Sequence, residues 1–196
     1  MISIGLDPGV SPGIAVWQSC ELDYPICLYS SPRWRKPLSP RQESEVLQEA
    51  LAAAKIATWP ERDDVVCVIE SQFAGPNPKT LIKLARSAGR WEAHAGLAGL
   101  RVIWCEPSEW RAELELEAKS SADIRDDLAA WCVDYGVTVS GPDAASACAL
   151  AVWGLAHPHG LDAEKAAAII EKARRKVERA GIAAARAARK AAKGAK

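Results

Sequence analysis

The chain has 196 residues, of which 49% are hydrophobic and 26% charged, and its 25 basic residues balance its 25 acidic ones. This length allows one well-packed domain with an extension. Residues 1–20 lack the basic start and long apolar stretch of a signal peptide, and no run reaches about 18 apolar residues, so we expect a cytoplasmic protein with no membrane partner. The six cysteines contain no Cys-x-x-Cys pair, which predicts small buried side chains in a reducing compartment and no zinc site.

Apolar periodicity predicts the secondary structure in chain order. We expect strands at 2–7, 13–17 and 26–30, a helix at 40–57, a strand at 65–69, a helix at 79–97 and a strand at 101–105. Two more helices are expected near 120–135 and at 142–156, before a C-terminal tail. A mixed sheet with helices on its faces is an α/β architecture. Turn residues at 158–160 predict a boundary between a domain at 1–158 and a helical tail at 159–196.

Three acidic residues stand at the ends of apolar elements. Ile2, Ile4 and Leu6 alternate with small residues and Asp7, so one face of the first strand is apolar and the other has room beside an acid. Glu70 follows the wholly apolar run 65–69, which is typical of a strand buried on both faces. Asp143 lies in the first turn of the apolar helix at 142–156.

Converging carboxylates predict a metal site. They repel one another unless a cation neutralises them, and hard oxygen ligands favour Mg²⁺ or Mn²⁺. Two such ions about 4 Å apart clamp the attacking and leaving oxygens in phosphodiester cleavage. Each acid also has a structural interpretation: Asp7 as a turn former, Glu70 as a solvated loop residue, and Asp143 as an acid favoured by the helix dipole. Their order and context, rather than any one residue, indicate catalysis.

The motifs Asp7-Pro-Gly between two strands, Glu70-x-x-Phe73 after a third and Asp143-Ala-Ala-x-Ala147 resemble the RuvC family of Holliday junction resolvases. The resemblance covers about residues 1–157. It implies an RNase H-like mixed five-stranded sheet with helices on both faces. It also implies a homodimeric endonuclease of DNA recombination or repair that uses Mg²⁺ or Mn²⁺, two ions per active site, and resolves four-way junctions in branched DNA by paired nicks.

The resemblance assigns catalysis and metal binding to Asp7, Glu70 and Asp143, adds Lys119 to the catalytic residues, and makes Phe73 stack on a base at the junction centre. A core aromatic is the alternative for Phe73. The other candidates for DNA contact are polar or basic side chains, namely Asn77, Lys79, Lys83, Arg86, Arg111, Arg174, Arg175 and Lys176. A solvated surface charge is the alternative for the basic ones.

One position departs from the family pattern. The family places a fourth metal ligand three residues after Asp143, where this chain has Ser146. A hydroxyl is a weaker Mg²⁺ ligand than a carboxylate, and Asp134 is a weak substitute. We therefore expect weaker metal affinity, with a preference for Mn²⁺.

The neutral net charge conceals a basic tail. Residues 164–196 carry eleven Lys and Arg against three Glu. The tail consists largely of helix-forming residues, and we expect either an arm that neutralises DNA phosphates or a solvated helix.

Three alternatives to a junction resolvase stay open. One is a nuclease of the same fold that cuts flaps or other branches, and another is a non-catalytic junction-binding protein that has lost cleavage through Ser146. A sugar-kinase or actin-like ATPase also begins with a strand and an Asp-x-Gly turn, but the chain is too short for its two lobes. The short, Ala- and Trp-rich sequence suggests a virus or plasmid source.

Overall fold

The computed structural model describes residues 1–9, 11–19, 25–32, 34, 36–55, 65–71, 78–116 and 121–160. In this part of the chain one sheet has five strands, with the order β3-β2-β1-β4-β5. The strands are β1 (Ile2–Asp7), β2 (Gly13–Gln18), β3 (Ile26–Ser30), β4 (Val65–Glu70) and β5 (Arg101–Cys105). The β1–β2 and β2–β3 pairs are antiparallel, whereas β1–β4 and β4–β5 are parallel. The sheet is therefore mixed, as the sequence predicted.

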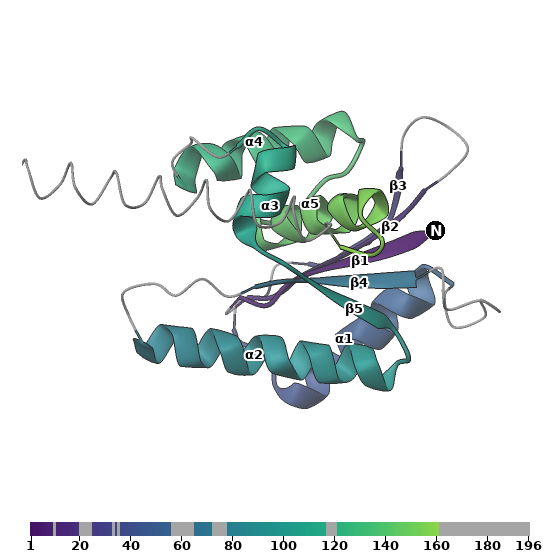
Figure 1. Cartoon of the computed structure of the whole chain (residues 1–196), viewed down its shortest axis with the longest axis vertical. Helices are drawn as coiled ribbons and strands as arrows, with labels where there is room; N and C mark the ends of the chain where they lie inside the picture. Colours follow the sequence, from purple (N-terminus) through teal and green to yellow (C-terminus); the bar gives the residue numbers. More distant parts are fainter. Residues whose placement is uncertain are drawn as a thin grey trace, which may run out of the picture. The chain divides into compact units, whose positions relative to one another are not determined.

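The described helices form two layers around this sheet. They are α1 (Pro40–Ala53), α2 (Pro78–Leu97), α3 (Pro107–Glu113), α4 (Ser121–Asp134) and α5 (Pro142–Ala156). Helices α1 and α2 lie on one face, and α3, α4 and α5 lie on the other (Figure 1). None of these described helices is both long and apolar enough to cross a membrane. The predicted α/β class, with helices on both faces of a five-stranded sheet, is confirmed.

The helices differ from the prediction in two places. Helix α1 ends at Ala53 rather than at residue 57, because Lys55 has a φ of 56°, which is incompatible with a continuing right-handed helix. Helix α3 was not predicted, because seven residues are too few for a periodic pattern. It begins with Pro107 at its first position, and the Glu109 carboxylate accepts a hydrogen bond from the backbone N–H of Glu106 at 2.7 Å.

The face of β1 that carries Ser3, Gly5 and Asp7 packs against α5. A methyl group added at Gly5 would overlap the backbone carbonyl of Ala147, and one added at Gly13 would overlap that of Asp143. The small side chains thus let the backbone of α5 lie directly on β1 and β2. Helix α5 fills the space that the small side chains leave along this face of β1, as far as Asp7 at the end of the strand.

The opposite face of the sheet builds the main apolar core. Ile2, Ile4 and Leu6 pack there with Leu47 of α1 and Trp91 of α2, all of them buried. Full burial of such a side chain stabilises the fold by about 1.5–3 kcal/mol. This layer fixes the positions of β1 and β4, whose ends carry Asp7 and Glu70.

Four of the five described cysteines are buried, as the sequence predicted, and the fifth is only partly buried. The four are the free thiols Cys67, Cys105, Cys132 and Cys148, and the fifth is Cys27. Burial raises the pKa of Cys67 to about 12, so this thiol stays protonated and unreactive at neutral pH.

Candidate active site

Asp7 and Glu70 end two neighbouring parallel strands. The pairing of β1 with β4 runs from Ile2 with Val65 to Leu6 with Ile69, so the next residues along the two strands are Asp7 and Glu70. Side chains alternate between the faces of a sheet. Both acids therefore lie on the face that carries Gly5 and Val68 and packs against α5. Because neighbouring strands are about 4.8 Å apart, the two carboxylates are neighbours.

Asp143 reaches the same region from α5. It is the second residue of that helix, after Pro142. A methyl group added at Gly9 would lie 3.6 Å from Oδ1 of Asp7 and 3.8 Å from Oδ1 of Asp143, so both carboxylates face the turn between β1 and β2. An acid in a first helical turn is also favoured by the helix dipole, by about 0.3–1 kcal/mol. The helix dipole thus favours a charged Asp143 carboxylate, whereas the neighbouring acids repel it.

The electrostatics show that the three acids interact. Burial raises the pKa of Asp7 well above its ordinary value of 3.8, and the charges of Glu70 and Asp143 raise it further. The backbone N–H of Gly9 and the guanidinium of Arg111 act in the opposite direction. Burial likewise raises the pKa of Glu70. The site therefore concentrates negative charge where water solvates it poorly, and a cation would relieve that cost.

Sequence reasoning missed Trp110, which joins the site from α3. Its indole Nε1–H donates a hydrogen bond to Oε1 of Glu70 at 3.0 Å, and the side chain is only 1% exposed. The guanidinium carbon of Arg111 lies 5.0 Å from the centre of the Trp110 ring. The sequence offers one local signal for this residue, its position beside Arg111 shortly after the predicted strand at 101–105.

The donor chemistry of the three acids suits a hard divalent cation, since carboxylate oxygens are the ligands that Mg²⁺ and Mn²⁺ prefer. Within the described residues, no three Asp, Glu, His or Cys side chains form a ready-made metal cluster. The fit thus rests on the donor set and its shared charge. Ser146 lies one turn after Asp143 and is partly exposed, whereas Asp134 is the exposed last residue of α4.

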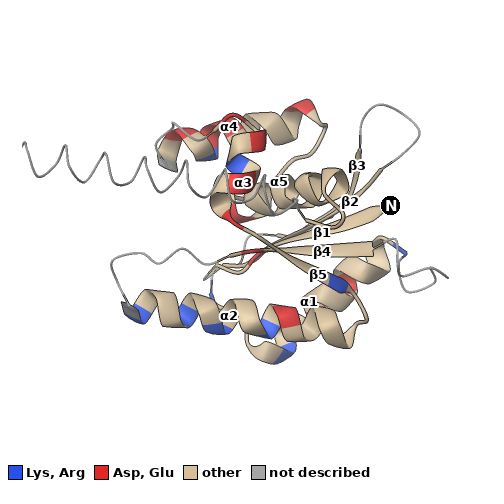
Figure 2. Ribbon diagram, in the orientation of Figure 1, with Lys and Arg blue, Asp and Glu red and all other residues tan. Residues whose placement is uncertain are grey.

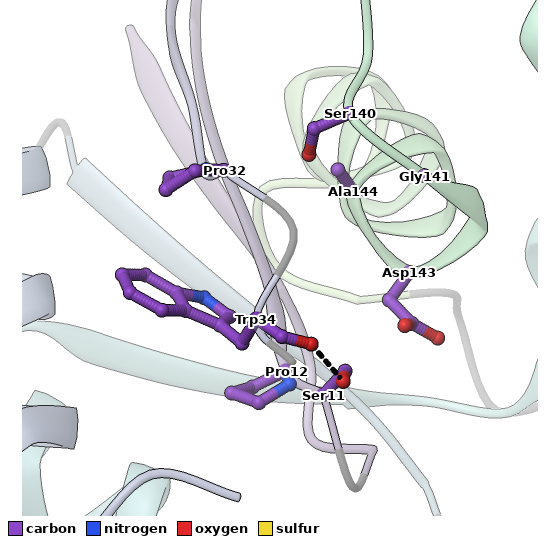
Figure 3. Close-up of a pocket in the computed structure, with 8 residues that line it drawn as sticks. All are labelled: Ser11, Pro12, Pro32, Trp34, Ser140, Gly141, Asp143 and Ala144. Atoms are coloured by element: carbon purple, nitrogen blue, oxygen red, sulfur yellow. Dashed lines mark hydrogen bonds between the residues drawn. The ribbon is translucent and has the colours of Figure 1, made fainter. Parts of the chain in front are cut away.

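A shallow pocket of about 10 Å³ lies beside Asp143 (Figure 3). Its walls are held by two hydroxyl groups: Ser11 Oγ donates to the carbonyl oxygen of Trp34 at 2.6 Å, and Ser140 Oγ donates to that of Ser31 at 2.8 Å. The volume is enough for a single water and too small for a nucleotide. The lining residues are Ser11, Pro12, Pro32, Trp34, Ser140, Gly141, Asp143 and Ala144.

Helix α2 carries basic residues along its N-terminal half (Figure 2). Lys79, Lys83 and Arg86 are exposed. Arg90, which continues the same spacing, instead binds the buried Glu43 of α1 through two hydrogen bonds of 2.7 and 2.6 Å. The basic surface therefore consists of the first three of these residues, and the fourth links two helices.

Six of the predicted site residues lie outside the described residues. They are Phe73, Asn77, Lys119, Arg174, Arg175 and Lys176. Their proposed roles stay predictions.

The sequence matches no protein-family model and no curated protein sequence. The fold does match solved structures. The structure of Thermus thermophilus RuvC has a TM-score of 0.55 and 16% identity, over 78% of this chain and 92% of that one. The structure of T. thermophilus RuvC in complex with Holliday junction substrate has a TM-score of 0.54 and 18% identity, over 78% and 91% of the two chains. The chain has a RuvC-like fold. The crystal structure of the yeast mitochondrial Holliday junction resolvase Ydc2 has a TM-score of 0.43 and 14% identity, over 76% of this chain and 75% of Ydc2.

The RuvC-like fold is what the motifs around Asp7, Glu70 and Asp143 predicted. At these low identities the likeness concerns the fold alone.

Proposed function

We propose that the chain is a metal-dependent endonuclease that resolves four-way DNA junctions by paired nicks. One observation carries the proposal: Asp7, Glu70 and Asp143 converge from β1, β4 and α5 at one edge of a RuvC-like fold. One RuvC structure of this fold is a complex with a Holliday junction substrate, which supports branched DNA as the substrate.

In this proposal the three carboxylates hold one or two Mg²⁺ or Mn²⁺ ions. Such ions supply Lewis-acid stabilisation of the negative charge that develops on the phosphate oxygens. Asp7 is partly buried beside the other two acids, and the β1–β2 turn at Gly9 faces it. Arg111 lies close enough to Asp7 and Glu70 to lower the pKa of both, and it would add positive charge beside the phosphate.

The DNA would follow the basic side chains of the chain. Lys79, Lys83 and Arg86 are exposed on α2, and each phosphate that they neutralise adds to affinity through counterion release. Lys119, Phe73, Asn77 and the basic residues of the tail are further candidates.

Paired nicks require two active sites, so we propose a twofold dimer. The exposed apolar side chains of α2 support this helix as the interface, because Ile82 is 51% exposed and Leu97 88% exposed. Sedimentation of the protein with and without an Ile82→Glu substitution tests this part of the proposal. A wild-type monomer at micromolar concentration would contradict it.

The function is tested by incubating a labelled four-way junction with the protein, beside matched duplex, flap and single-stranded DNA, in Mg²⁺ and then in Mn²⁺. Asp7→Asn is the inactive variant. Asp126→Asn is its matched control, since it makes the same acid-to-amide change on the exposed face of α4. We expect symmetric nicks in the junction, abolished by Asp7→Asn and retained in Asp126→Asn.

The other outcomes separate the alternatives. Equal cutting of flaps would indicate a general branch nuclease. Tight junction binding without cleavage in either metal would indicate a non-catalytic binding protein, the alternative that Ser146 in the place of an acid favours.

A further inference from the structure

We infer that Trp110 is a positioning residue of the acidic site: its indole N–H holds the carboxylate of Glu70, and its ring supports the guanidinium of Arg111. This inference rests on the proposed function, because the role of Trp110 is to arrange groups that bind metal and phosphate. Neither the motifs nor the compared structures assign this residue a role.

The pairing of β4 with β5 brings Trp110 to Glu70. Glu70 pairs with Cys105, and the N–H of Ser71 donates to the carbonyl of Cys105 at 2.8 Å. Helix α3 begins two residues after Cys105. The fourth residue of that helix is Trp110, so one helical turn returns its side chain to the end of β4.

The contact with Glu70 is direct and shielded from water. The Nε1–Oε1 distance is 3.0 Å, and the indole is 1% exposed. A hydrogen bond to an ionised acceptor is stronger than one between two neutral groups. The indole N–H occupies one lone pair of a carboxylate that has about four. Trp110 can therefore fix the orientation of Glu70 with a single contact.

The ring face has a second use. The Arg111 guanidinium carbon lies 5.0 Å from the ring centre, within the range of a cation–π contact. The Nε of Arg111 is buried, with no hydrogen-bond partner among the described residues. The position of the guanidinium is therefore limited by packing on Trp110 and not by a hydrogen bond of Nε. This packing keeps the guanidinium beside Asp7 and Glu70, whose negative charge it offsets.

The test is Mn²⁺ binding to metal-free, DNA-free protein, measured by electron paramagnetic resonance of the unbound ion. Trp110→Phe removes the N–H and keeps an aromatic ring. Loss of a group that orients a metal ligand costs about 10–100-fold in affinity, and we expect an increase of this size in the Kd for Mn²⁺. The matched control is Trp91→Phe. Trp91 is fully buried in α2, and its Nε1 has no hydrogen-bond partner in the described part of the chain.

Four outcomes decide the matter. A weaker Kd in Trp110→Phe, with a wild-type Kd in Trp91→Phe, supports the inference. Equal Kd values in wild type and Trp110→Phe, with binding lost in Asp7→Asn, overturn it and leave the proposed function standing. Tighter binding in Trp110→Phe also overturns it, because Trp110 would then hold Glu70 away from the metal. Wild-type protein that binds no Mn²⁺ overturns both the inference and the proposed metal site.

A second measurement needs no change at residue 110. The indole N–H of Trp110 gives its own signal in a ¹H–¹⁵N spectrum. If the hydrogen bond exists, Glu70→Ala shifts this signal and accelerates its exchange with solvent, while the signal of Trp91 stays in place. An unchanged Trp110 signal in Glu70→Ala would overturn the inference.

Discussion

Gly13→Ala tests whether contact between β2 and α5 positions Asp143. The added methyl would overlap the carbonyl carbon and oxygen of Asp143 and lie 2.9 Å from the backbone N of Ala144. All three are backbone atoms, so no side chain can rotate out of the way. Non-bonded carbon contacts need roughly 3.5 Å, so the start of α5 must move by about 1.5 Å. Overpacking of this kind costs about 1–3 kcal/mol, and a domain of this size loses about 2–4 °C in Tm for each kcal/mol.

We therefore expect Gly13→Ala to lower the Tm by about 2–12 °C. The same displacement moves a proposed ligand, and a shift of about 1 Å can cost 100-fold in rate. Junction cleavage and Mn²⁺ affinity should fall together. Gly96→Ala is the control for the substitution, because nothing lies within 4 Å of its added methyl, and its Tm should stay or rise. A wild-type Tm and Mn²⁺ affinity in Gly13→Ala would refute the close approach of β2 and α5.

Three further predictions concern charge. Asp7→Asn should raise the Tm of the metal-free protein at pH 7, because burial and neighbouring acids raise the pKa of Asp7 in the folded state. The wild type loses stability as pH rises from 3.8 through that raised pKa, so the gain should be largest above it and absent below pH 3.8; a gain independent of pH would contradict this origin. Arg90→Met should lower the free energy of unfolding in urea by about 1–3 kcal/mol, since Glu43, 2% exposed, loses two donors. This loss of stability is smaller than for a fully buried ion pair, because the Arg90 side chain is 38% exposed. An unchanged urea midpoint would show that the Arg90–Glu43 pair does not contribute to stability. Replacing the three exposed bases of α2 with Gln (Lys79, Lys83 and Arg86) should weaken the salt dependence of junction binding. The slope of log K against log salt should fall in magnitude by about 0.9 for each phosphate that is no longer neutralised. An unchanged slope would show that these three residues do not contact DNA.

Local sequence patterns predicted most of the fold. The alternation around Ile4 and the unbroken apolar run before Glu70 predicted β1 and β4 within a residue of their ends. Pro142 and the apolar residues after it predicted the bounds of α5. Such patterns work because a strand or helix of normal length repeats its burial several times. Helix α3 has seven residues and no such repeat, so only its capping contacts define it.

The candidate site divides in the same way. The sequence by itself determined which acids stand at the ends of β1 and β4 and at the start of α5, because each is a local feature of one element. Only the tertiary structure decided that Asp7 and Glu70 share a face, that Asp143 joins them, and that Trp110 holds Glu70. It also separated Arg90 from the basic surface by pairing it with Glu43. These relations depend on strand register and on helix packing between residues far apart in the chain. The free energy that selects them comes from burial of the whole core, which no single segment of the sequence contains.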